Sequence, residues 1–349
     1  MPRRPNRRAC LANLCTPTFP CVAAQVISAS RRTDIPAFFT PWFMQRVRQG
    51  FVLVRNPRNP NHVMRVSLAA DDVIAIVFWS RNYQPLIPHL PELDDRGLRP
   101  YFHLTLTGYG STIEPRAPNV GPVLSQLKTL SNRYGRDRII WRYDPILIGS
   151  RHDTSYHVHR FAELAQHIAP LAARCVVSFL DRYPSTIREL DRVTAATGET
   201  FEAPSLPDRS ALASELLAIC RDMHLDLSAC CEPDLLPDIP RARCIDPDLI
   251  HAFTAMPKGV FRDAPTRKGC GCVLARDIGA YHTCAHGCVY CYACESPERA
   301  LDHARRVDMH ANTLGPCDIQ VSEPDHRSRQ LPLLDTTPSV STNAHRRRG

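Results

Sequence analysis

One stretch decides the fold prediction: Ile139-Ile140-Trp141-Arg142-Tyr143-Asp144-Pro145. An apolar run of strand length ends in charged residues, and a proline follows them. Short apolar runs of this kind, separated by longer stretches, are typical of strands that are buried on both faces of a parallel sheet. The same pattern recurs along the chain, and the predicted strands are Val26–Ser30, Val73–Trp79, Phe102–Thr107, Ile139–Tyr143, Cys175–Phe179 and Leu225–Ala229.

Amphipathic stretches lie between these runs. The predicted helices are Pro41–Gln49, Val120–Tyr134, Tyr156–Ala172 and Ser210–Met223, and Phe51–Leu68 is predicted to form a small hairpin. Six strand–helix units in succession predict an α/β fold, a TIM-like barrel that is complete or partial and spans residues 25–258. A doubly wound open sheet is the main alternative. No glycine-rich phosphate loop follows the first strand, and this favours the barrel.

Charged side chains follow several of the predicted strands. In a barrel the reactive face is built at the carboxyl ends of the strands, so these residues predict a polar pocket there. Arginine binds carboxylates and phosphates bidentately, whereas an aspartate at such a boundary can equally cap a helix or form a turn. The candidate catalytic residues are Arg31, Arg32, Asp34, Arg142, Asp144 and Glu232.

A cysteine motif stands late in the chain, at Cys284-Ala285-His286-Gly287-Cys288-Val289-Tyr290-Cys291. Three thiolates at this spacing can hold an iron–sulfur cubane and leave one iron without a protein ligand. Two alternatives remain open. A structural zinc site could combine Cys270 and Cys272 with Cys288 and Cys291. A closed cluster that only transfers electrons could use Cys294 as its fourth ligand.

The chain has 15 cysteines in 349 residues. We find no secretory signal and no apolar run of membrane-spanning length, which favours reduced thiols and a cytoplasmic location. Cys230, Cys244, Cys270 and Cys272 form a candidate second site for zinc or an auxiliary iron–sulfur cluster, with Cys231 as a substitute for Cys230. The alternative is a set of buried, reduced thiols. The segment 259–316 is therefore predicted to be a cysteine-rich cluster segment at the barrel mouth.

The formal net charge of +8 is concentrated at the two ends of the chain. Removing seven terminal arginines from +8 leaves +1 for the rest: Arg3, Arg4, Arg7, Arg8, Arg346, Arg347 and Arg348. Residues 1–24 are predicted to be a disordered basic extension and residues 317–349 a disordered basic tail. Because the body is nearly neutral, its charge does not support nucleic-acid binding, although such a partner stays open. No membrane partner is expected.

The CxxxCxxC spacing, together with Tyr290-Cys291-Tyr292, resembles the motif of radical S-adenosylmethionine enzymes. The resemblance implies a 4Fe–4S cluster on Cys284, Cys288 and Cys291, with Tyr290 at the cofactor site. It also implies S-adenosylmethionine as cofactor and an electron donor such as ferredoxin or flavodoxin. A deoxyadenosyl radical would then act on an unknown substrate. The stretch Thr283–Tyr292 is similar to that of spore photoproduct lyase-type proteins, which implies nucleobase or DNA repair as one form of this activity.

A second resemblance extends over Val26–Ala293. It rests on Ser28–Pro36, Val54–Pro57, Val77–Ser80, Ile140–Pro145, Cys270–Cys272 and Asp277–Tyr281. These motifs resemble an uncharacterised bacterial family, domain of unknown function 1848. That family has a cysteine cluster near its C-terminal end and no established substrate. The cysteine loop here follows six strand–helix units, whereas most radical S-adenosylmethionine enzymes place it after the first strand. A non-catalytic zinc or closed-cluster protein is the alternative function.

Overall fold

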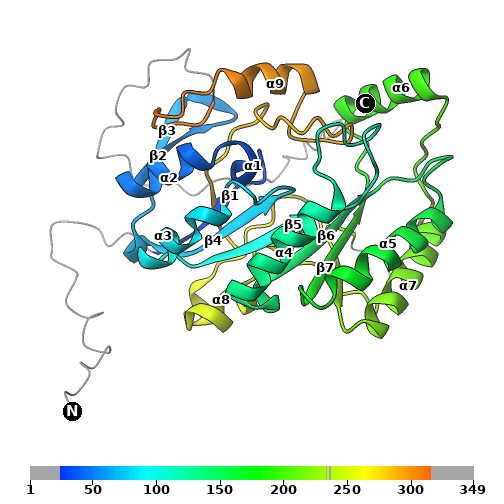
Figure 1. The fold of residues 1–349 in the computed structure, drawn as a ribbon, viewed down its shortest axis with the longest axis horizontal. Helices are drawn as coiled ribbons and strands as arrows, with labels where there is room; N and C mark the ends of the chain where they lie inside the picture. The colour runs from blue at the N-terminus through cyan, green and yellow to red at the C-terminus, as the bar shows by residue number, and fades with distance from the viewer. Residues whose placement is uncertain (1–23, 233, 236, 316–349) are drawn as a thin grey trace, which may run out of the picture.

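A seven-stranded parallel sheet forms the centre of the computed structural model, which describes residues 24–232, 234, 235 and 237–315 (Figure 1). The strand order is β8-β7-β6-β5-β4-β1-β9. The strands are β1 (Gln25–Ala29), β4 (Val73–Ser80), β5 (Pro100–Thr105), β6 (Ile139–Ile146), β7 (Arg174–Phe179), β8 (Asp226–Ala229) and β9 (Arg276–Asp277). All six predicted strands are present and parallel, so the α/β prediction is confirmed.

The predicted hairpin is also confirmed. Strands β2 (Phe51–Asn56) and β3 (Asn59–Ser67) pair antiparallel in a separate two-stranded sheet. The predicted terminal segments 1–24 and 317–349 lie outside the described residues, apart from residue 24.

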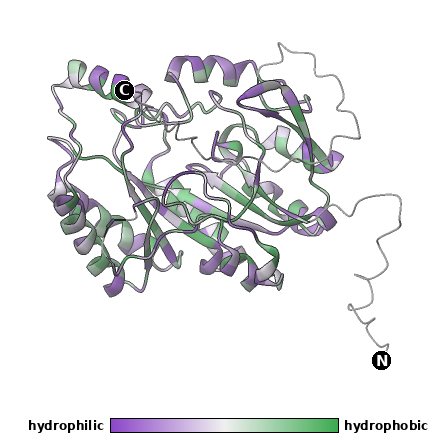
Figure 2. Cartoon of the chain, turned by 180° about the vertical axis from the view of Figure 1, so that it is seen from behind, coloured by the Kyte–Doolittle hydropathy of each residue, from purple (hydrophilic) through white to green (hydrophobic). Residues whose placement is uncertain are grey.

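One face of the main sheet is covered by helices. Inward residues of α2 (Thr40–Gln49), α3 (Leu90–Asp95), α4 (Val120–Tyr134), α5 (Thr154–Ile168) and α7 (Leu206–Asp222) share one hydrophobic core with alternate strand residues such as Phe78, Phe102 and Trp141. Period-two alternation sends these side chains to the same face. Figure 2 shows the hydrophobic residues concentrated on the central strands and the hydrophilic ones on the outer sides of the helices.

The opposite face carries a second core. Val77, Tyr101 and Ile140 point to this side, and they pack against α8 (Pro247–Thr254) and against residues of the segment 242–273. Two cysteines of the CxC turn at 270–272 belong to this core. The predicted cysteine-rich segment therefore lies partly against the sheet itself rather than only at its end.

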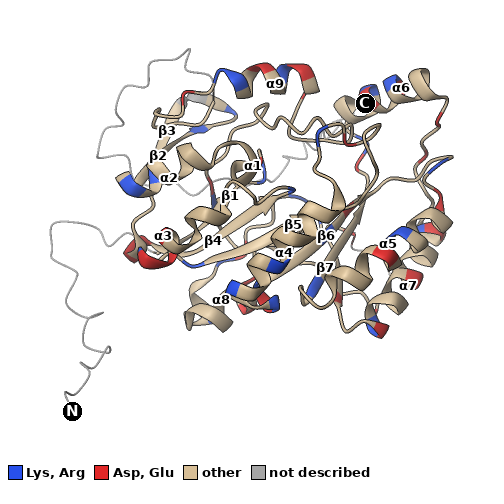
Figure 3. Cartoon of the chain, in the orientation of Figure 1, with Lys and Arg blue, Asp and Glu red and all other residues tan. Residues whose placement is uncertain are grey.

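The remaining helices contribute few residues to these two cores. They are α1 (Ile35–Phe38), α6 (Pro184–Thr197) and α9 (Pro297–Arg305). Short 3-10 turns occur at Ala70–Asp72, Ile87–His89, Arg136–Arg138 and Lys258–Val260. No helix in the described ranges is both long enough and apolar enough to cross a membrane. Figure 3 shows basic and acidic residues together on α5 and α9, in line with the near-neutral charge of the body.

The order of strands follows the order of the chain from β1 through β8. The late strand β9 pairs with β1 on its other side, at Ile27 with Arg276 and Ser28 with Asp277. Within the described residues no pairing joins β8 to β9, so the sheet is open and the complete form of the predicted barrel is not observed. Strand β9 places the cysteine-rich segment 259–316 beside the first strand, and the two predicted segments share one sheet.

Candidate functional site

The cysteine loop lies at the carboxyl edge of the sheet, where side chains from three strand ends hold it. Asp34, just after β1, is buried and accepts four hydrogen bonds. The donors are the backbone N–H of Ala37 (2.9 Å), Ser80 Oγ (2.7 Å), the backbone N–H of Arg81 (2.9 Å) and His286 Nε2 (2.8 Å). Asp34 therefore caps helix α1 and also fixes the imidazole in the middle of the CxxxCxxC motif.

Arg81, Glu114 and Tyr290 form a second anchor. Arg81 Nη2 lies 2.9 Å from Glu114 Oε1, and both side chains are buried. The Tyr290 hydroxyl donates to the Glu114 carboxylate and accepts from Arg81. Burial lowers the pKa of Arg81, but the Glu114 carboxylate and its neighbours outweigh it, so that the pKa lies well above its ordinary value. Tyr290, which was predicted to be a cofactor residue, is thus tied to a buried ion pair.

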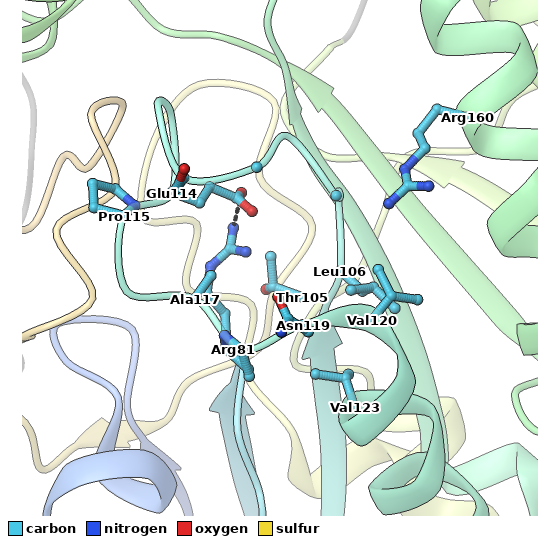
Figure 4. Close-up of a pocket in the computed structure, with 14 residues that line it drawn as sticks. Arg81, Thr105, Leu106, Glu114, Pro115, Ala117, Asn119, Val120, Val123 and Arg160 are labelled. Carbon is cyan, nitrogen blue, oxygen red and sulfur yellow. Dashed lines mark ion pairs between the residues drawn. The ribbon is translucent and has the colours of Figure 1, made fainter.

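A cavity of about 250 Å³ adjoins this ion pair. Figure 4 shows Arg81 and Glu114 pointing toward each other on one side of it, while Arg160 of α5 approaches from the other. Thr105 at the end of β5, the connection between β5 and α4, and the first residues of α4 complete its lining. The cavity therefore opens at the carboxyl edge of β4 and β5, next to the residues that hold the cysteine loop.

The backbone of the loop is fixed as well. Val289 N–H donates to the carbonyl of Ile113 (3.1 Å), and the guanidinium of Arg116 donates to the carbonyl of Ala285. Gly287 has a φ of 73°, a left-handed conformation that side chains rarely adopt, and a Cβ there would overlap the Arg116 guanidinium. The left-handed turn therefore favours glycine at this position, and a side chain there would also displace the Arg116 guanidinium.

The loop cysteines, which we define as Cys284, Cys288, Cys291 and Cys294, are gathered in this loop. The Cys284 thiol interacts electrostatically with those of Cys288 and Cys291, and burial raises its pKa well above the ordinary value. Burial also raises the pKa of Cys288, to about 12. Cys294 hydrogen-bonds Cys291 and donates weakly to the carbonyl of Cys284, at 3.8 Å. Cys288, Val289 and Tyr290 join a third hydrophobic core with residues of α6.

The arginines after β1 converge on an aspartate of β9. Asp277 accepts from Ser28 Oγ (2.7 Å), Ser30 Oγ (2.7 Å) and the backbone N–H of Arg31 (2.8 Å). The Nε atoms of Arg31 and Arg32 both lie 3.9 Å from its carboxylate. The Tyr292 hydroxyl, which follows the last cysteine of the motif, donates to the carbonyl of Arg31 (2.7 Å).

Arg142 and Asp144, at the end of β6, form an ion pair with each other. Arg142 also donates to Cys244 Sγ (3.0 Å), and its guanidinium lies 5.4 Å from the Trp79 ring. Asp144 accepts from Ser178 of β7. Both Arg31 and Arg142 interact electrostatically with the Tyr292 hydroxyl. The structure therefore brings Arg31 and Arg142 to one region between Cys291 and Cys244.

Glu232 makes a different set of contacts. Its carboxylate accepts from the backbone N–H of Phe179 (2.9 Å) and from Arg209 of α7 (2.9 Å). Burial raises its pKa above the ordinary value. The bonds of its carboxylate join the end of β7 to α7.

Five further cysteines meet on the sheet face opposite the main helical layer, and we call them the sheet-face cysteines: Cys230, Cys231, Cys244, Cys270 and Cys272. The Sγ of Cys230 lies 3.8 Å from that of Cys231 and 3.7 Å from that of Cys244. Cys244 also interacts with Cys272, Cys272 with Cys270, and Cys270 with Cys231, through their effects on one another's pKa. The four residues predicted for a second site are thus brought together, with Cys231 among them.

As they stand, no three His, Cys, Asp or Glu side chains within the described ranges form a group that could hold a metal ion. The sheet-face thiols lie beside one another without surrounding a common point. All cysteines of the described residues are free thiols, so they remain available as ligands.

Several residues of the site were not predicted from the sequence. Glu114 and Arg116 lie in the connection between β5 and α4, which has no recognisable pattern. Asp277 stands within a family-like motif, yet only the pairing of β9 with β1 brings it beside Arg31. His286 lies inside the cysteine motif, where a polar residue between two ligands could have suggested an anchor.

Comparison with known proteins gives one match to a solved structure and one to a family. The solved structure is a variant of Rhizobium etli pyruvate carboxylase crystallised without acetyl coenzyme A, with 10% sequence identity and a TM-score of 0.24. The match covers 59% of this chain and 23% of that one, so the chain spans about a quarter of the length of that enzyme chain. No curated protein matches. The family described as domain of unknown function (DUF1848) matches residues 26–293, and this chain belongs to that family.

Proposed function

We propose that the protein is a radical S-adenosylmethionine-type enzyme. Cys284, Cys288 and Cys291 would bind a 4Fe–4S cluster with one open iron. When bound, such a cluster supplies an electron for cleavage of S-adenosylmethionine, and the resulting deoxyadenosyl radical abstracts hydrogen from a substrate. The observation that carries the proposal is the position of the motif. Three thiols of one loop are held at the carboxyl edge of a parallel sheet, where α/β enzymes place their reactive residues.

The donor set fits a cluster. Thiolates are the usual ligands of iron–sulfur clusters, and the three cysteines of the motif share one buried loop. Arg81 interacts electrostatically with Cys284 and Cys288, so a positive charge stands beside thiolates that would be negative when they bind metal. The loop is anchored by buried hydrogen bonds that His286 and Tyr290 donate to Asp34 and Glu114, which would hold the cysteines in place as a cluster enters.

The residues between the two cysteine groups would bind the organic cofactor and substrate. Arg31 and Arg142 each have a carboxylate partner, in Asp277 and Asp144. A carboxylate or phosphate of a ligand could exchange with these partners, because the guanidinium fork suits both groups. Tyr292 lies between Cys291 and this pair of arginines, and its ring could exclude water from the loop. These roles make Arg31, Arg32, Arg142 and Asp144 positioning residues.

The fold supports the same proposal. The strand order follows the chain from β1 to β8 without the reversal that a doubly wound sheet contains, and we interpret the open sheet as a partial barrel. We place the protein in the cytoplasm, where thiols stay reduced and a ferredoxin or flavodoxin could deliver the electron. A nucleobase substrate remains one form of the proposal, although the near-neutral body offers little charge for duplex binding.

Anaerobic reconstitution tests the proposal. The full chain, loaded with iron and sulfide, should change its absorption and paramagnetic resonance spectra on addition of S-adenosylmethionine. After reduction it should release 5′-deoxyadenosine. The Cys284→Ala variant should lose both properties, whereas Cys294→Ala should retain them. Intact spectral responses in Cys284→Ala would contradict the proposed ligand set.

One observation favours a second candidate, a closed cluster without catalysis. Cys294 hydrogen-bonds Cys291 and lies close to the backbone of Cys284, within reach of the same metal. If Cys294 were the fourth ligand, S-adenosylmethionine would leave the spectra unchanged. The Cys294→Ala variant would then open an iron and gain a spectral response that the natural chain lacks.

A further inference from the structure

The sheet-face cysteines make a second, separate constellation of potential metal ligands. They come from three parts of the chain: Cys230 and Cys231 follow β8, Cys244 precedes α8, and Cys270 and Cys272 flank one glycine. None of them belongs to the CxxxCxxC loop. They pack on the sheet face opposite the main helical layer, around a core that contains Tyr101, Ile140 and Val176.

The spacing of the sulfurs indicates the kind of metal. With zinc–sulfur bonds of about 2.3 Å, the thiolates of a tetrahedral site lie about 3.8 Å apart. The Cys230–Cys244 sulfur distance is 3.7 Å. Thiolates on a cubane bind different irons and point away from each other, so they stand farther apart than ligands of one ion. The observed contacts therefore suit a single metal ion better than an auxiliary cluster.

Four of the thiols form a continuous chain of contacts, from Cys230 through Cys244 and Cys272 to Cys270. They do not yet surround a common point. Thiols that already lie close together have little distance to cover when they close around an ion. Gly271 lets the turn approach the segment before α8, since a Cβ there would lie 3.1 Å from the carbonyl oxygen of Ala242.

Groups around the thiols are suited to stabilise thiolates. Arg142 donates to Cys244 Sγ (3.0 Å), the backbone N–H of Ile245 donates to Cys272 Sγ (3.4 Å), and Thr266 Oγ1 donates to Cys270 Sγ (3.6 Å). Such donors are the usual surroundings of metal-bound sulfur and fix the orientation of the ligands. Four thiolates around a divalent ion leave a net negative charge, and the Arg142 guanidinium offsets part of it.

An entry path is present as well. A cavity of about 370 Å³ opens beside the sheet-face cysteines and has Cys270 and Cys272 in its lining. Its basic lining residues, Arg241, Arg267 and Lys268, add positive charge next to the thiols. Ligand identity, ligand spacing, surrounding donors and access are the features by which a metal site can be checked.

We propose that Cys230, Cys244, Cys270 and Cys272 bind one tetrahedral divalent ion of the zinc class, and that Cys231 is not a ligand. The ion joins the segment after β8, the segment before α8 and the CxC turn to the sheet face. Four sulfur ligands fill the coordination sphere, so the site is structural rather than catalytic. The proposal is independent of the function proposed for the loop cysteines.

Metal analysis of the full chain tests this proposal directly. A variant with Cys284, Cys288 and Cys291 all changed to alanine removes the proposed loop ligands and leaves the sheet face intact. Purified without oxygen, it should hold about one zinc per chain. The additional change Cys272→Ser should abolish zinc binding, while Cys220→Ala, at a buried cysteine on the helical side of the sheet, should leave it unchanged. Iron with sulfide in the alanine variant, or no metal at all, overturns the proposal.

A second measurement does not depend on how the Cys272→Ser variant folds. Chelator-treated protein carrying the three alanines is titrated with Co²⁺ alone. A tetrahedral four-thiolate site should give intense sulfur-to-cobalt charge-transfer absorption with a one-to-one end point, and added Zn²⁺ should remove it. Weak absorption typical of oxygen ligands, or an end point well above one cobalt per chain, would overturn the assignment.

Discussion

The two cysteine groups differ in how they are assembled. The loop cysteines stand close together in the sequence, and side chains from distant strand ends hold their loop in place. The sheet-face cysteines are scattered along the chain between Cys230 and Cys272, and they touch one another directly. In the first group local spacing gathers the thiols and the fold positions them; in the second group the fold itself gathers the thiols. Loss of a sheet-face ligand should therefore affect the whole fold, while loss of a loop ligand should affect mainly the loop.

The largest effect is expected from Cys244→Ser in the metal-loaded protein. Cys244 contacts both Cys230 and Cys272 and lies in the core of the sheet face, so its loss removes the ion and disconnects three segments. We expect the free energy of unfolding to fall by more than about 4 kcal/mol. Chemical denaturation followed by circular dichroism measures it.

Cys284→Ala is the matched control for that experiment. It removes one thiol from the loop and should cost less than half as much, because no segment of the sheet depends on it. Equal losses in the two variants would show that the two groups contribute alike to the fold, and the contrast between them would be wrong.

The next largest effect is expected from Glu114→Ala. The change leaves Arg81 buried without its ion-pair partner and removes the acceptor of the Tyr290 hydroxyl. Breaking a buried pair in this way costs about 4 kcal/mol. Zinc content at the sheet face should be unchanged, because Glu114 contacts the loop and not the sheet-face cysteines. Denaturation and metal analysis of the same sample measure both, and Glu114→Gln should lose less because it keeps a hydrogen-bond acceptor.

Asp34→Ala should have a somewhat smaller effect. It removes the helix cap of α1 and the acceptor for Ser80, Arg81 and His286, at a cost of about 3 kcal/mol. Iron loading of the loop should fall, since His286 loses its anchor. Asp34→Asn keeps one carbonyl acceptor and serves as the control. Normal iron loading in Asp34→Ala would show that the His286 contact does not position the loop.

These residues also show how far the sequence could predict the site. The apolar runs predicted the strands because most of them are buried on both faces, which requires apolar residues at nearly every position; β8 is the exception, with Asp226 exposed. Asp34 was predicted at a strand end as either a pocket residue or a helix cap, and it caps α1 while also accepting a hydrogen bond from His286. A charged residue directly after an apolar run can be recognised in the sequence alone, without knowledge of the fold.

The partners of these residues could not be predicted in the same way. Glu114 reaches Arg81 and Tyr290 only because a patternless connection folds back over the sheet edge. Asp277 reaches Arg31 because β9, a strand of two residues, pairs with β1 from far along the chain. Such contacts depend on which strands are neighbours in the sheet, and the local pattern of apolar residues does not indicate this. The same reason explains why Cys231 was only a substitute ligand in the prediction, although it lies within the ring of contacts.

The stability of the protein should also depend on pH through His157, a buried residue of α5. Its Nδ1 accepts from Tyr143 (2.8 Å) and its Nε2 donates to the carbonyl of Leu147 (3.0 Å), and burial lowers its pKa to about 4. The unfolded chain has the ordinary value of about 6.5 and binds the proton first, so stability falls as the pH drops from 6.5 toward 4. Between pH 7.5 and pH 5 the part of this loss that His157 contributes should be about 2 kcal/mol.

Denaturation at several pH values measures this loss, with His157→Gln as the control. Glutamine can keep both hydrogen bonds but does not titrate, so the variant should lose about 2 kcal/mol less over the same pH range. His103 stays in place in both proteins, and burial lowers its pKa to about 4 as well, so it contributes equally to both curves. Identical pH profiles for the two proteins would rule out the contribution of His157.

The smallest effect is expected from Cys231→Gly, and its sign distinguishes a ligand from a neighbour. Cys231 has a φ of 62°, a left-handed conformation that costs a residue with a Cβ about 1 kcal/mol and costs glycine little. If Cys231 is not a ligand, the variant should keep its zinc and should be unchanged or more stable by up to about 1 kcal/mol. If the ring of contacts instead places Cys231 on the metal, zinc is lost and stability falls as it does for Cys244→Ser. Metal analysis and denaturation of this variant therefore decide whether Cys231 is among the four sheet-face cysteines that bind the ion. The test is possible because glycine adopts the left-handed backbone conformation of Cys231 more easily than a residue with a side chain does.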